Sequence, residues 1–248
     1  MLRYARMIAH LRLYARLAAL VVTLFVALLV HGLWRSIRRP SPWPRLFLGT
    51  VGRIVGARVR VVGEPLRRDV VFVANHLSWI DILLLAGKTG SAFVAKAELR
   101  GVPLVGWLCT LNATIFVSRE DRLGVAGQIA AIRAAIDTSR PVTIFPEGTT
   151  GDGHAVLPFK AALLGALDAP APPRIRVQPV RIDYGAATDD LAWVGDEPGG
   201  DHARRVLQRR GSFVATLQFL PPFAPADVGG RKAIAAEARR RITGAGHA

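Results

Sequence analysis

Two short polar clusters each follow a run of apolar residues, and the first could move a proton. It reads Asn75-His-Leu-Ser-Trp-Ile-Asp81 and comes directly after the β-branched run at 70–74. An imidazole suits proton transfer because its unperturbed pKa lies near neutrality. A neighbouring carboxylate can fix the ring's tautomer and stabilise the imidazolium that forms. His76 and Asp81 are therefore a candidate general base and its partner.

The spacing of these two residues constrains the backbone between them. Five positions on one straight helix would place the side chains about 140° apart, so they would not meet. If residues 75–77 form a turn and a helix begins near Ser78, the carboxylate can fold back towards the imidazole. Ser78 and Asp81 also have the spacing of a capping box, in which Asp81 would only cap the helix. The motif alone leaves both interpretations open.

The second cluster, Pro146-Glu-Gly-Thr-Thr-Gly-Asp-Gly153, follows another strand-like run. It combines a carboxylate with hydroxyls, and its glycines would let backbone amides approach an oxyanion or a phosphate. An ordinary solvated loop is the commoner explanation for such a turn. Two further strand-like runs end in cations, Lys96 and Arg119, and a guanidinium could pair with an anionic headgroup.

We expect these clusters at the strand ends of one α/β domain. From residue 46 onward, short β-branched runs alternate with alanine- and leucine-rich ones, which predicts a mixed, largely parallel sheet covered by helices. Expected strands are residues 57–62, 70–74, 92–95, 114–117, 141–145, 175–182 and 212–219, and expected helices are residues 79–86, 103–111, 122–137, 160–166 and 231–242. Residues 185–201 are expected to form a long surface loop. The carboxyl ends of parallel strands are where such sheets usually bind ligands.

The N-terminal segment favours attachment to a membrane. Residues 17–34 are almost entirely apolar, with arginines on both sides, and would form a helix about 27 Å long, close to the thickness of a hydrocarbon core. We expect a spanning or half-embedded helix; a buried core helix is the alternative. Three prolines at 40–44 should interrupt it. Residues 1–45 are thus expected to be a membrane-attaching helix and linker, and residues 46–248 the main domain.

Charge and cysteine content narrow the class of partner. The formal charge of +15 comes almost entirely from arginine and favours nucleic acid or the acidic face of a membrane. The basic runs near the C-terminus lack interleaved aromatic residues for stacking on bases, so we expect acidic phospholipid and no nucleic acid. Solvated helix faces remain the alternative. The single cysteine, Cys109, excludes an intramolecular disulfide and a cysteine-based zinc cluster, and we expect no bound metal.

Four blocks, in order, resemble those of the glycerolipid acyltransferase family, whose best-known members are 1-acylglycerol-3-phosphate acyltransferases. The blocks are Asn75-His76 with Asp81, Ile115-Phe-Val-Ser-Arg119, Phe145-Pro-Glu-Gly-Thr149 and Val177-Gln-Pro-Val180. The resemblance implies that His76 is the base and Asp81 its partner, and that Pro179 and Val180 line the acyl side. It implies a set of residues that hold the substrate's polar head: Asn75, Ser78, Lys96, Arg119, Glu147, Gly148, Thr149 and Thr150.

The resemblance also implies a reaction and its partners. An acyl chain would pass directly from a thioester of coenzyme A or acyl carrier protein, as co-substrate, to a lysolipid hydroxyl, without a cofactor or a covalent enzyme intermediate. The protein would lie at the inner (cytoplasmic) membrane with its catalytic domain on the cytoplasmic side. Since both flanks of the apolar helix are basic, the sequence itself does not fix this orientation.

One departure bears on the acceptor. Family members that make phosphatidic acid usually read Phe-Pro-Glu-Gly-Thr-Arg, whereas this chain has Thr150 at the last position. Losing a fork-shaped guanidinium should weaken bidentate capture of a phosphate, and the version here resembles members that acylate lyso-ornithine lipid, whose head is an amino acid. We expect 1-acylglycerol-3-phosphate as acceptor, giving phosphatidic acid. Lyso-ornithine lipid is the alternative, and a non-catalytic basic membrane adaptor is a second alternative.

Overall fold

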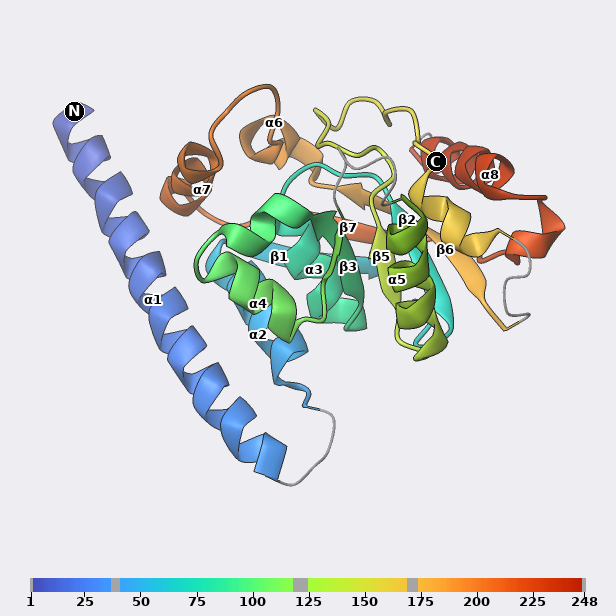
Figure 1. Ribbon diagram of the computed structural model, residues 1–248. Helices are drawn as coiled ribbons and strands as arrows, with labels where there is room; N and C mark the ends of the chain where they lie inside the picture. Colours follow the sequence, from blue (N-terminus) through green and yellow to red (C-terminus); the bar gives the residue numbers. More distant parts are fainter. Residues whose placement is uncertain (1, 37–40, 118–124, 169–173, 247–248) are drawn as a thin grey trace.

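A seven-stranded sheet forms the centre of the protein (Figure 1). The computed structural model describes residues 2–36, 41–117, 125–168 and 174–246. Across the sheet the strands run in the order β1-β7-β6-β2-β5-β3-β4. Neighbours are parallel except β6 and β7, which are antiparallel. The expected mixed, largely parallel sheet is confirmed. The strands are β1 (Ala57–Val62), β2 (Val70–Ala74), β3 (Ala92–Lys96), β4 (Ile115–Val117), β5 (Val142–Ile144), β6 (Arg176–Asp183) and β7 (Phe213–Phe219).

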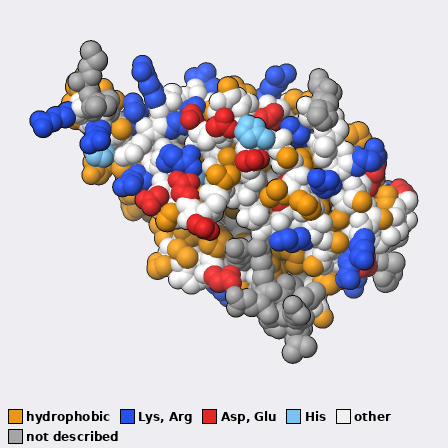
Figure 2. Space-filling model, turned by 90° about the horizontal axis from the view of Figure 1, so that it is seen from above, with side chains coloured by type: hydrophobic (Ala, Val, Ile, Leu, Met, Phe, Trp, Pro, Cys, Tyr) orange, Lys and Arg blue, Asp and Glu red, His pale blue; other side chains and the backbone are white. Residues whose placement is uncertain are grey.

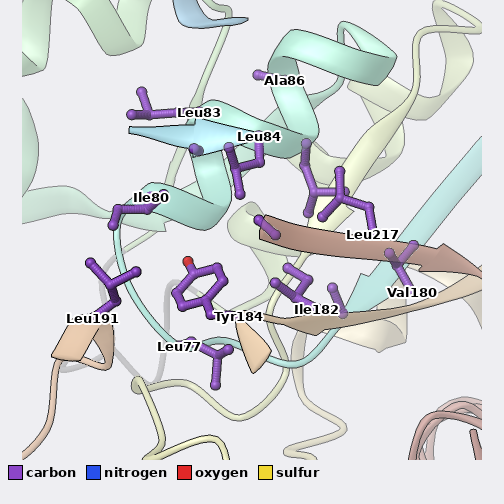
Figure 3. Packing of buried hydrophobic residues seen from close by; sticks show 14 of the residues in the cluster. Leu77, Ile80, Leu83, Leu84, Ala86, Val180, Ile182, Tyr184, Leu191 and Leu217 are labelled. Carbon is purple, nitrogen blue, oxygen red and sulfur yellow. The ribbon is translucent and has the colours of Figure 1, made fainter. Parts of the chain in front are cut away.

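Helices cover both faces of this sheet because its central strands are apolar on both sides. In β2, Phe72 belongs to one buried cluster, while Val71 and Val73 belong to the other. The first cluster is completed by α2 (Trp43–Ile54) and α3 (Ile80–Thr89). From α3, Leu84 points towards the strands that carry Ile182 and Leu217 (Figure 3). The second is completed by α5 (Val125–Asp137) and α8 (Arg231–Gly244).

The expectation for residues 185–201 was wrong. Instead of a surface loop, the segment holds a 3-10 turn, η3 (Gly185–Ala187), then α6 (Thr188–Leu191), and α7 (Gly199–Gln208) begins within it. The polar composition concealed a few apolar residues that fold inward, because Ala187 and Leu191 are buried in the first core cluster. The helix expected at 160–166 is likewise a shorter 3-10 turn, η2 (Leu163–Leu167). The remaining elements are η1 (Ala97–Gly101), α4 (Val105–Leu111) and η4 (Pro225–Asp227).

A single long helix, α1 (Leu2–Ser36), precedes the sheet. Residues 6–34 are long and apolar enough to cross a membrane, and none of the most apolar window is buried, which does not fit a core helix. The first half of α1 is docked on the domain. Arg16 Nη1 donates to the carbonyls of Val206, Leu207 and Arg209 at 2.9–3.0 Å. These carbonyls close the C-terminus of α7, where unpaired acceptors and the helix dipole favour a cation.

The expected linker at residues 35–45 is shorter than the sequence indicated. Residues 37–40 lie outside the described residues, and α2 already begins at Trp43 with Pro44 in its first turn. Proline is tolerated there because the first amides of a helix have no partner within it. The division of the chain at residue 45 stays a prediction. It would cut through α2, which packs along α3.

Basic side chains are spread over the molecule. On the face seen in Figure 2, lysine and arginine side chains stand apart from one another with acidic ones between them. The large positive charge therefore forms no continuous stripe on the described part of that face.

The contact between α2 and α3 makes a sharp stability prediction. An added Cβ at Gly87 would lie 2.6 Å from the Cα of Gly49, whereas a Cβ at Gly49 would lie 3.5 Å from the Cα of Gly87, an ordinary contact. Gly87→Ala should destabilise the fold by about 1–3 kcal/mol, because the helices must move apart. The matched Gly49→Ala variant should match or exceed wild-type stability. Thermal unfolding in detergent, followed by circular dichroism, measures both, and equal melting temperatures would contradict the prediction.

Candidate active site

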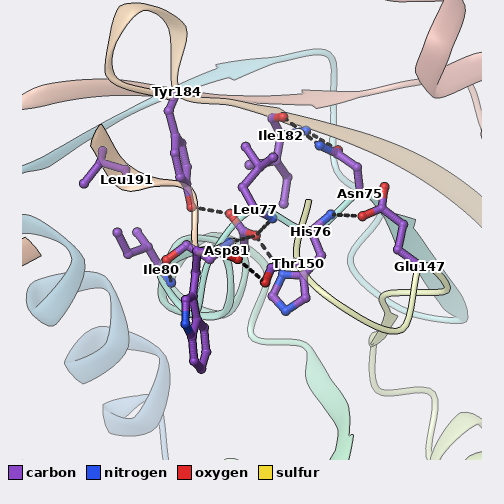
Figure 4. A network of polar contacts seen from close by, with 12 residues as sticks. Asn75, His76, Leu77, Ile80, Asp81, Glu147, Thr150, Ile182, Tyr184 and Leu191 are labelled. Carbon is purple, nitrogen blue, oxygen red and sulfur yellow. Dashed lines mark hydrogen bonds and ion pairs between the residues drawn. The ribbon is translucent and has the colours of Figure 1, made fainter. Parts of the chain in front are cut away.

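His76 and Asp81 meet just beyond the carboxyl end of β2 (Figure 4). His76 Nδ1 lies 2.8 Å from Asp81 Oδ2. The turn expected before the helix is present, since α3 begins at Ile80. The same Oδ2 accepts the backbone N–H groups of Leu77 at 2.7 Å and Ser78 at 3.0 Å. One carboxylate therefore both binds the backbone that enters α3 and holds the imidazole. The expected meeting of the two side chains is confirmed, and the catalytic role of the pair stays a prediction.

The hydrogen bond fixes which ring nitrogen can act. A carboxylate oxygen accepts hydrogen bonds, so the network assigns the proton to Nδ1 and leaves the lone pair on Nε2. Nε2 makes no hydrogen bond within the described part of the chain. The His76 side chain is 17% exposed, whereas the Asp81 side chain is fully buried. The ring also stacks on Phe145, with centroids 4.0 Å apart and an angle of 12° between the planes, which sets its orientation.

Glu147 joins the second cluster to the first. Strands β2 and β5 are parallel neighbours, so the two polar clusters emerge at the same edge of the sheet. Glu147 is buried; its Oε2 accepts the His76 backbone N–H and its Oε1 accepts that of Leu157, both at 3.2 Å. Gly151 N–H donates back to the His76 carbonyl at 2.8 Å. The glutamate thus holds the backbone of His76.

The buried environment perturbs this carboxyl group. Burial raises the pKa of Glu147 to about 7, although its two backbone hydrogen bonds act in the opposite direction. Carboxyl groups with a raised pKa occur more often at functional sites than elsewhere, and this one is one hydrogen bond away from the backbone of His76.

Other residues expected to hold the substrate serve the protein's own framework. Asn75 exchanges two hydrogen bonds with the backbone of Ile182, at 2.7 and 2.9 Å, and so fastens β2 to β6. The buried Ser78 hydroxyl accepts the Ile80 N–H at 3.3 Å. The Thr150 hydroxyl donates to the Trp193 carbonyl. Their predicted contact with substrate stays untested, but each side chain already has a partner.

The remaining expected residues divide into three groups. Gly148 has a φ of +75° that glycine adopts without strain, and Thr149 next to it is exposed. Lys96 ends β3, but its side chain and all of Arg119 lie outside the described residues, so their roles stay predictions. Val180 is fully buried in the core, and the expectation that Pro179 and Val180 line the acyl side stays a prediction.

The sequence reasoning missed Tyr184. This residue follows the carboxyl end of β6, the other parallel neighbour of β2, and its hydroxyl donates to Asp81 Oδ1 (Figure 4). Burial and the nearby Asp81 charge raise the pKa of Tyr184 well above its usual range. The available signal was a polar residue two positions beyond the strand predicted at 175–182, but this residue lies immediately before the segment that was expected to be a surface loop.

Besides His31, whose Nδ1 lies 2.8 Å from the Ser41 hydroxyl, two other histidines in the described part of the chain have partners but lack this arrangement. His154 Nε2 lies 2.8 Å from Asp189 Oδ1, and both side chains are largely exposed. His202 is buried, accepts the Trp79 indole N–H at 2.8 Å and contacts the Leu191 carbonyl at 3.1 Å. Burial lowers the pKa of His202. Neither pair combines a buried carboxylate with an unpaired ring nitrogen.

Comparisons with known proteins show the family of this chain. The sequence model of the family described as Acyltransferase matches residues 58–183. The chain is 33% identical over 239 residues to a lyso-ornithine lipid O-acyltransferase of Rhodobacter capsulatus, covering 91% of this chain and 86% of that protein. It is 36% identical over 114 residues to a 1-acyl-sn-glycerol-3-phosphate acyltransferase of Neisseria gonorrhoeae, covering 44% and 45%.

A solved structure shares the fold. The 1-acyl-sn-glycerophosphate acyltransferase of Thermotoga maritima superposes with a TM-score of 0.63 at 22% identity, over 95% of this chain and 97% of that one. The chain belongs to the acyltransferase family. It is an enzyme that transfers acyl groups, and the alternative of a non-catalytic adaptor is not supported.

The raised pKa of Glu147 predicts a pH-dependent stability. Between pH 4.5 and about 7 the folded protein keeps a proton that the unfolded chain has released. Stability from this group is therefore present below that window and falls as the pH rises through it, by about 3 kcal/mol at most. Relative to Glu147→Gln, which does not titrate, the wild-type melting temperature should fall from about pH 5 to about pH 7.5. A difference that stays constant across this range would contradict the assignment.

Proposed function

We propose that this chain is a lyso-ornithine lipid O-acyltransferase that uses His76 as general base. The observation that carries the acyl-transfer chemistry is the buried Asp81 carboxylate holding His76 Nδ1, with Nε2 left unpaired at the ligand-binding edge of the sheet. The proposal replaces 1-acylglycerol-3-phosphate, our expectation from sequence, as the favoured acceptor.

In the proposed reaction, His76 Nε2 removes the proton from the acceptor hydroxyl as its oxygen attacks the thioester carbonyl. The C–O bond forms and the tetrahedral intermediate then expels the sulfur. The imidazolium returns its proton to the departing thiolate, so an ester and a free thiol are the products. Asp81 stabilises the imidazolium between these two steps. The donor would be acyl-coenzyme A or acyl carrier protein, and His76 requires no covalent intermediate to act.

Two observations support ornithine over phosphate in the acceptor's head. The similarity to the Rhodobacter lyso-ornithine lipid enzyme extends over 91% of this chain, against 44% for the Neisseria 1-acyl-sn-glycerol-3-phosphate enzyme. Thr150 stands where an arginine would suit a phosphate, and its hydroxyl is bonded to the Trp193 carbonyl. Residue 150 therefore supplies no cation for a phosphate, and its hydroxyl is already used within the protein.

The long helix supports a place at the membrane. On the apolar half of α1 the exposed residues include Val21, Phe25 and Leu29. If this half lies in the bilayer, the enzyme stays at the membrane surface, where its lipid acceptor is found. Attachment to the inner membrane, with the catalytic domain on the cytoplasmic side where coenzyme A and acyl carrier protein thioesters are available, is part of the proposal.

His76→Ala should lower turnover by about 10²–10⁴, because general base catalysis contributes that much. The matched control is His154→Ala, which removes an exposed histidine with the same 2.8 Å contact to an aspartate; it should retain near wild-type activity. Release of free thiol from an acyl thioester, dependent on added lysolipid, measures both variants. Wild-type turnover by folded His76→Ala protein would remove His76 from the mechanism.

The acceptor is tested by competition. Purified enzyme given lyso-ornithine lipid and 1-acylglycerol-3-phosphate in equal amounts should favour the former by about tenfold or more in kcat/KM, as expected when a site lacks the groups that one headgroup needs. Product mass separates the two esters. The reverse preference would overturn the ornithine assignment and leave the acyl-transfer chemistry intact, in agreement with the Neisseria and Thermotoga relatives.

A further inference from the structure

We propose that Tyr184 is a positioning residue for acyl transfer: its hydroxyl holds the Asp81 carboxylate in the orientation that keeps His76 Nδ1 protonated and Nε2 free to accept a proton. The proposal rests on the proposed role of His76 as base. It concerns a residue outside the four sequence blocks, just beyond the end of β6, the strand next to the one that His76 follows.

Hydrogen-bond donors surround both oxygens of the Asp81 carboxylate. Oδ2 accepts three hydrogen bonds, from His76 Nδ1 and from the backbone of Leu77 and Ser78. Oδ1 accepts one, from the Tyr184 hydroxyl, and among the described residues it has no other donor. Because the Asp81 side chain is fully buried, water cannot replace the tyrosine. Without it, a carboxylate oxygen would be buried and unpaired, which is costly.

The surroundings of Tyr184 indicate that its hydroxyl is the reason for a tyrosine at this position. The ring lies in the first core cluster among Leu77, Ile80 and Leu191 (Figure 3) and packs edge to face on Phe213, with centroids 5.6 Å apart. A phenylalanine would fill this space equally well. Since burying a hydroxyl without a partner is unfavourable, the bond to Asp81 is the feature that distinguishes the two residues.

The hydroxyl remains a donor under all working conditions. Burial raises the pKa of Tyr184, and the Asp81 charge raises it further, so the phenol keeps its proton throughout the pH range of the reaction. A donor at Oδ1 draws negative charge away from Oδ2 and stops the carboxylate from rotating. Removing it should therefore have two separable effects. The imidazolium of His76 gains a stronger partner, and the ring loses its fixed orientation.

Tyr184→Phe in the full-length, detergent-solubilised enzyme separates these effects. The acidic limb of the kcat/KM profile should move to higher pH by about 0.5–1 unit, a fraction of the energy of one charged hydrogen bond. At the plateau, kcat should fall roughly tenfold, which is the rate factor for 1.4 kcal/mol of lost orientation. KM for both substrates should stay unchanged, because the buried side chain does not reach them. An acidic limb that stays in place would overturn the proposal.

The matched control is Phe213→Leu, which loosens the packing around the same ring but keeps the hydroxyl. It should lower the melting temperature and leave the acidic limb in place. A limb shift in Phe213→Leu equal to that in Tyr184→Phe would mean that packing alone is responsible, and would also overturn the proposal.

An isosteric replacement covers the case in which Tyr184→Phe does not fold. The chain has three tyrosines, and the other two, Tyr4 and Tyr14, are exposed on α1, so both can be changed to Phe and the remaining one replaced by 3-fluorotyrosine. The more acidic phenol is a stronger donor, so the acidic limb should move to lower pH, opposite to Tyr184→Phe.

The wild-type profile separates this proposal from the proposed function. If the wild-type pH profile has an acidic limb and 3-fluorotyrosine at position 184 does not shift it, the proposed role of Tyr184 is wrong and that of His76 is unaffected. A wild-type enzyme with no acidic limb, or with no acyl transfer, would overturn the role of His76 and with it that of Tyr184.

Discussion

The buried carboxylate of Asp81 is the constraint on which the rest of the site depends. A fully buried carboxylate is tolerated only when donors surround it, and here four converge on it from the turn after β2 and from the end of β6. The turn after β2 and the end of β6 must both be in their native positions before the carboxylate can orient the His76 ring. The site is thus a product of the sheet, because no local segment could satisfy the carboxylate alone.

The order of the strands explains how residues far apart in sequence reach one edge. Strands β6, β2 and β5 are parallel neighbours, so the residues that follow them, Tyr184, His76 and Glu147, emerge side by side. The tyrosine supports the carboxylate, and the glutamate binds the backbone of the base. Asn75 closes the remaining gap by fastening the turn to β6. The hydrogen bonds that orient the site residues are therefore also bonds that join neighbouring strands of the sheet.

The sequence predicted what depends on local pattern. The strand at 57–62, the strand at 70–74 and the convergence of His76 with Asp81 follow from apolar periodicity and from the geometry of a turn before a helix. What it missed depends on distant partners. Leu191 belongs to a short apolar run within a segment rich in glycine and acidic residues, and it is buried because the core beneath α3 receives it. The framework role of Thr150 was equally invisible, because its partner is the carbonyl of Trp193, 43 positions away, whose place the tertiary fold decides.

The arginine contacts of α1 have a consequence for how the substrate arrives. Arg12 and Arg16 bind the last carbonyls of α7, so the first half of the helix can neither roll about its axis nor slide along the domain. With the apolar half embedded as proposed, the enzyme would meet the bilayer at one fixed height and one fixed azimuth. The lipid acceptor would then reach the site by lateral diffusion in the plane of the membrane, and the enzyme would not have to reorient to meet it.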